Sequence, residues 1–217
     1  MKQPLRHKQA GFSLLELSIV LIVLSLLASA IIPSLGAQRT QQAFRQTEQK
    51  LDIARDALLG YAVRNGYLPC PSFVTDTHAA TYGEAADSCI GASTEGFLPF
   101  RTLGLTEGDG WTNPMMYRVD PAFTHSLGQN ISLTTAFTVN LAVYDSQGNK
   151  LTSDAERPVA LLMSSGADGL LNGENGSFET VTARYESHPP TSGFDDIVIW
   201  LGRPSLFGVL IKAGVGM

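Results

Sequence analysis

One carboxylate stands inside the most apolar part of the chain. Between Leu17 and Ile32 there are 16 consecutive residues without a charge, and Glu16 directly precedes them. An ionised carboxylate in hydrocarbon costs about 2.5 kcal/mol or more, so it needs a cationic partner there. In the first turn of a helix the macrodipole favours an acid by less than about 1 kcal/mol, which does not offset that cost. Glu16 is therefore a candidate for pairing with a positive charge.

Three further carboxylates, Asp168, Asp195 and Asp196, belong to polar, glycine-rich stretches. The stretch SSGADGLLNGENG (164–176) also holds Asn172 and Asn175, and FDDIVIW (194–200) supplies the last two acids. Flexible, oxygen-rich loops suit a hard cation such as calcium, which takes roughly six to eight oxygen ligands. Gly, Asn and Asp also favour solvated turns for local reasons, and spacing alone favours this second interpretation.

Two cysteines, Cys70 and Cys89, enclose a polar loop that has little to pack. In an oxidising compartment a bridge between them would stabilise the fold by about 3 kcal/mol, and we expect it to form. The alternative is a pair of free thiols. Neither a third cysteine nor a histidine stands at the spacing of a zinc site.

The sequence carries no motif for enzymatic chemistry. It lacks a Gly-x-Ser-x-Gly elbow, a phosphate-binding glycine loop and a His-Glu-x-x-His run. Ser165 is the last residue of a predicted strand, but nothing marks a base for it. We therefore predict that the protein is not an enzyme. The net charge is −5, and the only basic cluster lies in the first eleven residues, so we expect no direct nucleic-acid binding.

Two kinds of helix are expected before residue 66. The apolar stretch is long enough to span a bilayer of about 30 Å, and the basic residues before it place the N-terminus in the cytoplasm. A cleavable signal or a simple anchor is the alternative interpretation. After Pro33, apolar residues recur at steps of three or four until Asn65-Gly66, which predicts an amphipathic helix with a left-handed cap.

The remainder is predicted to be rich in β-strands. Five stretches contain many β-branched and aromatic residues, and DSQGNK (145–150) resembles the turn of a hairpin. A helix followed by strands predicts an α+β fold in which a long N-terminal helix packs on an antiparallel sheet. The tail at 206–217 is compatible with a strand or a short helix. The expected strands lie at 114–119, 131–145, 157–165, 178–186 and 195–202.

The stretch GFSLLEL, with Gly11, Phe12 and Glu16, followed by Pro33, resembles the prepilin signature of type IV pilins and type II secretion pseudopilins. The resemblance implies that a prepilin peptidase cuts after Gly11 and that the new amine of Phe12 is methylated. It also implies that Glu16 pairs with the Phe12 amine of a neighbouring subunit, and that the helix bends at Pro33. The fold it implies is pilin-like.

The C-terminal half is similar to the major pseudopilin, in which an Asp-Pro-Trp-Gly-Asn-Pro run precedes a calcium loop. Here the run is DGWTNP (109–114), so Gly110 replaces the proline and Thr112 replaces the glycine. A long insertion also separates the GADG loop from the later Asp-Ile. By this resemblance Asp168, Asp195 and Asp196 become candidate calcium ligands, and no other cofactor is expected. The longer body fits a minor or accessory subunit.

Together these expectations give four segments: a leader at 1–11, a membrane and filament-core helix at 12–35, its amphipathic half at 36–66 and a periplasmic β-rich head at 67–217. The expected protein is a structural subunit of a pilus or pseudopilus. It would cross the bacterial inner membrane once and then enter the filament. The expected partners are the peptidase, other subunits, the inner-membrane assembly platform and membrane lipid. The alternative is an anchored periplasmic binding module that does not polymerise.

Overall fold

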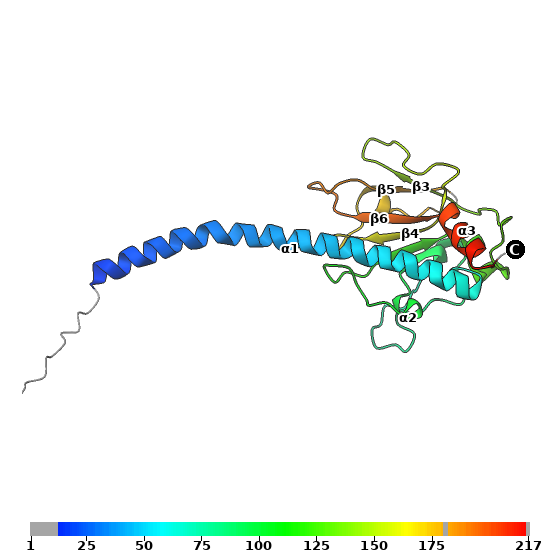
Figure 1. Cartoon of the computed structure of the whole chain (residues 1–217), viewed down its shortest axis with the longest axis horizontal. Coiled ribbons are helices and arrows are strands. Elements are labelled where there is room, and N and C mark those ends of the chain that lie inside the picture. Colours follow the sequence, from blue (N-terminus) through cyan, green and yellow to red (C-terminus); the bar gives the residue numbers. More distant parts are fainter. Residues whose placement is uncertain (1–12, 180–181, 216–217) are drawn as a thin grey trace, which may run out of the picture. The chain divides into compact units, whose positions relative to one another are not determined.

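The structure is a computed structural model that describes residues 13–179 and 182–215, without the side chains of 28–35, 37 and 92. The chain forms two compact units, Met1–Gln41 and Gln42–Met217, which are described separately below. The first helix, α1, covers Leu14–Asn65 and so contributes to both units (Figure 1).

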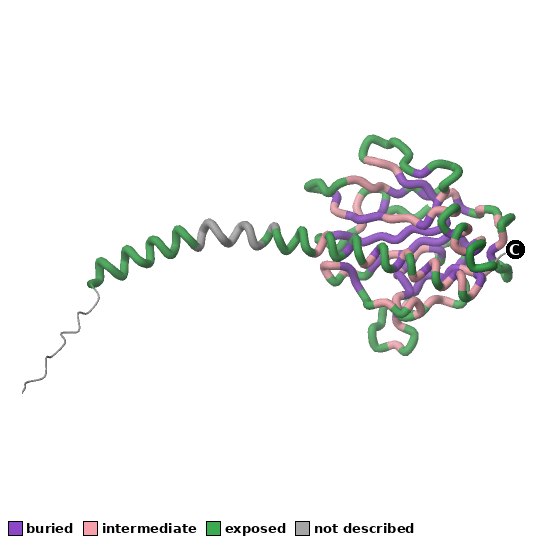
Figure 2. Tube along the Cα trace, viewed as in Figure 1, coloured by how far each residue is buried: buried purple, intermediate pink, exposed green. Residues whose placement is uncertain are grey.

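In the first unit, α1 is covered with apolar side chains. Eleven large ones between Leu14 and Leu27 are exposed (Figure 2). Polar groups in this stretch fold back on the helix, since the hydroxyls of Ser18 and Ser25 donate to the carbonyls of Leu15 and Leu21, both at 2.7 Å. Across the described residues, no helical stretch combines the length and apolar character that crossing a membrane requires.

In the second unit, α1 is amphipathic, as the residue spacing predicts. Leu51, Ala54, Leu58 and Ala62 recur every three or four residues and are completely buried. Gly66 ends the helix with a φ of 82°, and its amide donates to the carbonyl of Ala62 at 2.8 Å. This is the left-handed cap expected from the sequence.

The main sheet is antiparallel, as predicted, and has the strand order β1-β2-β4-β6. A second sheet pairs β3 with β5 in parallel. The strands are β1 (Glu95–Phe97), β2 (Met116–Val119), β3 (Asn140–Tyr144), β4 (Pro158–Ser164), β5 (Thr182–Glu186) and β6 (Ile197–Gly202).

The main sheet is covered on both faces. Leu162 of β4 belongs to a core cluster that includes the buried stripe of α1, whereas Leu161 and Met163 belong to a second cluster with β3 and β5. All seven residues of β4 are therefore buried. This arrangement explains why the β4 sequence is an uninterrupted apolar run rather than an alternating one.

Some sequence predictions are wrong in detail. The hairpin turn at 145–150 forms as predicted, with an antiparallel bridge between Tyr144 and Lys150. The strand expected at 131–145, however, is confined to β3, which pairs in parallel with β5. Strand β1 was not predicted, and the undecided tail begins as a helix, α3. The remaining helices are α2 (Phe100–Leu103), α3 (Arg203–Lys212) and the 3-10 turns Gly91–Thr94, Pro121–Phe123, His125–Leu127 and Gly173–Gly176.

The loop before β2 is fastened to α1 by its backbone. The Gly110 amide donates to the Thr47 hydroxyl at 2.8 Å, and the Lys50 ammonium donates to the carbonyls of Gly108 and Asp109, both at 2.9 Å. A β-carbon on residue 110 would lie 2.1 Å from the carbonyl oxygen of Ala43. Only glycine fits this close approach.

The same loop is tied to the end of β4 by side chains. Asp109 is buried; its Oδ1 accepts hydrogen bonds from the amides of Trp111 and Asn113, and its Oδ2 accepts one from the Ser164 hydroxyl. The amide group of Asn113 donates to the carbonyl of Gly166 at 2.7 Å. The DGWTNP run therefore connects α1 to the main sheet.

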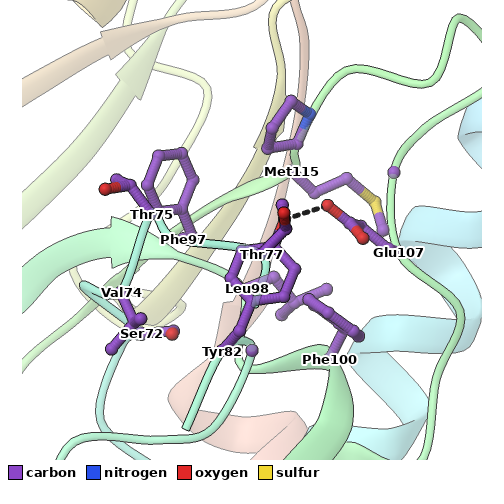
Figure 3. Close-up of a pocket in the computed structure, with 13 residues that line it drawn as sticks. Ser72, Val74, Thr75, Thr77, Tyr82, Phe97, Leu98, Phe100, Glu107 and Met115 are labelled. Carbon is purple, nitrogen blue, oxygen red and sulfur yellow. Dashed lines mark hydrogen bonds between the residues drawn. The ribbon is translucent and has the colours of Figure 1, made fainter. Parts of the chain in front are cut away.

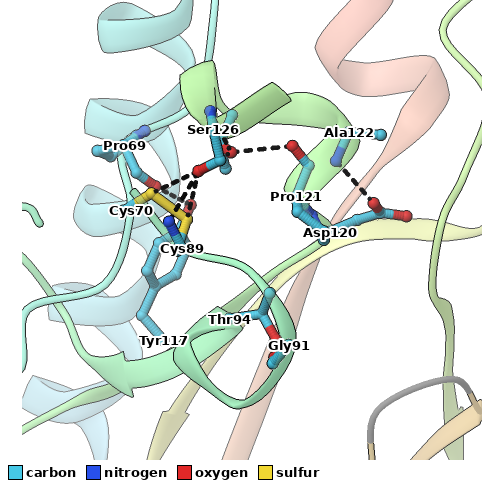
Figure 4. Close-up of a disulfide and its surroundings, with 11 residues drawn as sticks. Pro69, Cys70, Cys89, Gly91, Thr94, Tyr117, Asp120, Pro121, Ala122 and Ser126 are labelled. Carbon is cyan, nitrogen blue, oxygen red and sulfur yellow. Dashed lines mark hydrogen bonds between the residues drawn. A yellow bond between two sulfur atoms is a disulfide. The ribbon is translucent and has the colours of Figure 1, made fainter. Parts of the chain in front are cut away.

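Cys70 and Cys89 form a disulfide, as predicted, with their Cα atoms 5.6 Å apart (Figure 4). The Ser126 hydroxyl oxygen lies 3.3 Å from the sulfur of Cys70 and 3.4 Å from that of Cys89. It also accepts a hydrogen bond from the Cys89 amide at 2.8 Å. The bridge thus closes the 70–89 loop and holds it beside the 3-10 turn at His125–Leu127.

We expect the double substitution Cys70→Ser, Cys89→Ser to lower the free energy of unfolding by about 3 kcal/mol, because the unfolded chain regains the freedom of this loop. Urea denaturation under oxidising conditions measures the change. Ser88→Ala, an exposed position in the same loop, is the control and should leave the stability unchanged. Equal stabilities of the double variant and the native protein would contradict the expectation.

Thr112 has a φ of 71°, the only left-handed value at a non-glycine residue within the described ranges. A β-branched side chain is strained there by about 1–2 kcal/mol. We expect Thr112→Gly to raise the free energy of unfolding by about 1 kcal/mol, measured by urea denaturation. Thr106→Gly, in the same loop but without a positive φ, is the control and should not stabilise the protein. No gain in Thr112→Gly, or an equal gain in the control, would contradict the strain.

Candidate functional site

Glu16 lies in the first turn of α1, and its side chain is exposed. Its carboxylate makes no hydrogen bond or ion pair with residues 13–179 or 182–215. Gly11 and Phe12, the predicted cleavage and methylation positions, lie outside the described residues. Position 33, where a bend was expected, falls within α1, and the helix continues on both sides of it. The side chain of Pro33 is not described. The helix therefore presents a free acid at its N-terminal end, where the macrodipole favours it.

The three candidate calcium ligands belong to one hydrogen-bond network in the second unit. The Oδ2 atom of Asp195 accepts from the amides of Ala167 and Asp168 at 2.6 and 3.2 Å. Gly166 permits this approach, since a β-carbon there would lie 2.4 Å from the Asp195 carboxyl carbon. The turn after β4 and the start of β6 are thus in direct contact, although Asp195 lies 28 positions after Ala167 in the sequence.

Asp196 is the most deeply buried of these acids, with 3% of its surface exposed. Its Oδ2 atom accepts from the Asn172 amide at 2.8 Å and from the Asn175 side chain at 2.9 Å. The pKa of Asp196 is raised from 3.8 to about 6, chiefly by burial; the hydrogen bonds from Asn172 and Asn175 lower it, and the negative charges of Asp195 and Asp168 raise it.

Asp168 lies at the exposed side of the network. It accepts hydrogen bonds from the Leu170 amide at 2.8 Å and from the Asn172 side chain at 3.3 Å. The Asn172 side-chain oxygen in turn accepts from the Asp195 amide at 3.1 Å. Asn172 and Asn175 were not among the candidate ligands, yet they organise all three acids. Their position in the glycine-rich loop was the available signal.

Two carboxylate oxygens in this network have no partner. Oδ1 of Asp195 and Oδ1 of Asp196 are buried and accept no hydrogen bond from the described residues. Unpaired buried acceptors are unfavourable, so a cation or an ordered water would stabilise them. Within the described ranges, however, no group of three or more His, Cys, Asp or Glu residues is arranged to hold a metal ion.

No catalytic arrangement is formed around the remaining candidates. Ser165 is buried, and no described histidine donates to it or accepts from it. His188 lies 3.2 Å from the Glu186 carboxylate and stacks on Phe194 with ring centroids 3.9 Å apart. These contacts fix the loop after β5 and do not assemble a nucleophile with a base.

Comparison with known proteins identifies one segment. Residues 6–32 match the family model described as the prokaryotic N-terminal methylation motif. No curated protein and no solved structure matches the chain. The matched segment includes Gly11, Phe12 and Glu16, so the chain carries the N-terminal methylation motif that is characteristic of type IV pilins and pseudopilins.

Proposed function

We propose that the protein is a structural subunit of a type IV pilus or a type II secretion pseudopilus. The observation that carries the proposal is the methylation motif at residues 6–32, which leads into an apolar helix with a single acid, Glu16, in its first turn. The α+β second unit, in which a helix packs on an antiparallel sheet, suits the same role. In the proposal the chain is cleaved after Gly11 and methylated on Phe12.

Glu16 supplies the proposed specificity of assembly. Apolar helices pack on one another without a preferred register when every residue is hydrophobic. A buried acid changes this, because a neighbouring subunit must bring a cation within reach. The methylated amine of Phe12 keeps its positive charge and is the proposed partner. An added subunit that placed its amine elsewhere would leave both charges unpaired in an apolar environment.

The proposed location follows from the same segment. The helix at 12–35 would anchor the protein in the bacterial inner membrane, with the leader in the cytoplasm and residues 67–217 in the periplasm, before it enters the filament. Prepilin peptidase, other subunits, the assembly platform and membrane lipid are the proposed partners. The length of the head favours a minor or accessory subunit. An anchored binding module would use the same body but would need neither a cut after Gly11 nor an acid at Glu16.

We expect Glu16→Leu to leave membrane insertion intact and to lower incorporation into filaments at least about tenfold, since an ion pair worth 1.4 kcal/mol corresponds to a factor of ten. The variant is expressed with the native subunit in the natural host, so filaments still form. Immunoblotting of sheared filaments and of membranes gives its share in each fraction.

Ser18→Ala is the matched control, because it removes another polar group from the same turn of the helix without changing the charge. It should be incorporated like the native subunit. Equal incorporation of Glu16→Leu and Ser18→Ala would refute the pairing mechanism. Mass analysis of the native N-terminus tests the rest of the proposal: an unmodified Met1 would favour the anchored module.

A second proposal concerns calcium at the network of Asp168, Asp195 and Asp196. The unpaired oxygens of Asp195 and Asp196 support it, since a hard cation prefers such ligands. Because the described carboxylates form no group of three for a metal ion, backbone and amide oxygens would have to complete its coordination. Bound calcium would neutralise the repulsion among the acids and join the turn after β4 to the start of β6.

We expect millimolar calcium at pH 7 to raise the melting temperature of the protein by about 2–4 °C, which corresponds to about 1 kcal/mol for a chain of this size. Asp196→Asn should lose this response, because it removes a negative charge while the amide oxygen can still accept the hydrogen bonds. Asp87→Asn, at an exposed position, controls for net charge and should respond like the native protein. The same response in all three proteins, or in none, would refute the site.

A further inference from the structure

A cavity of about 400 Å³ lies in the second unit, away from the carboxylate network (Figure 3). Its walls come from three segments: the loop closed by the Cys70–Cys89 disulfide, the strand β1 with the following helix α2, and the loop that leads into β2. The volume is within the range of small-molecule sites, roughly 300–1,000 Å³. No role described above uses this cavity.

The walls of the cavity are mainly apolar and aromatic. Phe97 and Leu98 follow each other at the end of β1, Phe100 begins α2, and Met115 precedes β2. The ring of Phe100 packs directly on Gly83, where a β-carbon would lie 2.3 Å from the ring. Tyr82 meets Phe100 edge-to-face, with ring centroids 5.6 Å apart. This lining suits an aromatic or branched aliphatic group.

Polar groups are few and specifically placed. Among the described residues that line the cavity, only Glu107 is charged, and Oε1 of its carboxylate accepts a hydrogen bond from the Tyr82 hydroxyl. Oε2 has no hydrogen-bond partner among the residues that the structure describes. The hydrogen bond between Tyr82 and Oε1 of Glu107 raises the pKa of Tyr82, so the Tyr82 hydroxyl remains a donor. One carboxylate oxygen is held in place at the rim, and the other is free to accept a hydrogen bond.

A second polar group lies within the lining. Ser72 has only 1% of its surface exposed, and its hydroxyl has no hydrogen-bond partner among the described residues. A buried hydroxyl without a partner is unfavourable, by about 1–3 kcal/mol. The hydroxyl oxygen itself is not exposed to the cavity, so the Glu107 carboxylate is the charged group that a ligand can reach.

The most irregular wall of the cavity, the 70–89 loop, is fixed by a disulfide and by hydrogen bonds. The disulfide joins the two ends of the 70–89 loop. The side chain of Arg101 donates to the carbonyl of Ala80 at 2.6 Å, its amide donates to the carbonyl of Gly83 at 2.9 Å, and the Ala85 amide donates to the Thr102 hydroxyl at 2.8 Å. A preorganised site loses less entropy on binding.

We propose that this cavity binds a small organic cation, namely an aromatic or branched aliphatic group that carries an ammonium. The apolar group occupies the space beside Phe97, Phe100 and Met115, and the ammonium donates to the Glu107 carboxylate. Anions are disfavoured because no cationic side chain lines the cavity and the protein has a net charge of −5. The inference is independent of filament assembly.

Ligand-observed NMR with 2-phenylethylammonium tests the proposal, using the full chain in nanodiscs of zwitterionic lipid and empty nanodiscs as the blank. We expect saturable binding of this probe and much weaker binding of 3-phenylpropionate, which has the same ring and the opposite charge. Equal binding of the two probes, or no binding of 2-phenylethylammonium, would overturn the proposal.

Two variants locate the site. Glu107→Gln keeps the acceptor for Tyr82 but removes the charge, and it should weaken binding of the ammonium probe about three- to fivefold, as for an exposed ion pair. Thr77→Trp, at an exposed position in the wall, should fill the cavity and abolish binding. Glu84→Gln removes a nearby exposed carboxylate outside the lining and should bind like the native protein. If both cavity variants bind like Glu84→Gln, the site is refuted.

Discussion

The backbone of Gly110 meets the backbone of α1 with no side chain between them, and the second unit is organised around this contact. A single β-carbon at this position would overlap the carbonyl of Ala43. The close approach allows Thr47 and Lys50 of α1 to form hydrogen bonds with the loop. Asp109 of the same loop accepts a hydrogen bond from Ser164 at the end of β4, so the loop joins α1 to the sheet. The position of α1 along the sheet is therefore set by directional hydrogen bonds as well as by its apolar stripe.

The same chain of contacts continues to the carboxylate network. Asn113 binds the carbonyl of Gly166, and the absence of a side chain at Gly166 lets Asp195 approach the turn after β4. A cation at Asp195 and Asp196 would consequently reinforce the corner of the sheet to which the α1 loop is attached. The run that resembles the pseudopilin motif thus has a structural role that does not depend on calcium.

The sequence predicted the elements better than their pairing. Periodicity located α1 within the second unit and its end at Gly66, and β-branched content located β2, β4 and β6, because these signals are local. The parallel pairing of β3 with β5 depends on residues about forty positions apart, and the turn at 145–150 gives no information about it. The oxygen-rich loops indicate the three acids, but the hydrogen bonds of Asn172 and Asn175 depend on the folded loop. The cavity beside Glu107 has no sequence signal, since three separate segments form it.

Asp196 and Glu16 are both acids without a cationic partner in the described chain, but the consequences differ. Folding itself buries Asp196, so the unfavourable energy is present in every molecule and appears as the raised pKa. Glu16 is exposed on its helix, so its charge is unfavourable only when lipid or neighbouring helices surround it. In the proposed filament, the requirement for a cation would therefore arise at insertion or assembly and not during folding. An acid placed in this way would direct how subunits join without entering the core of the second unit.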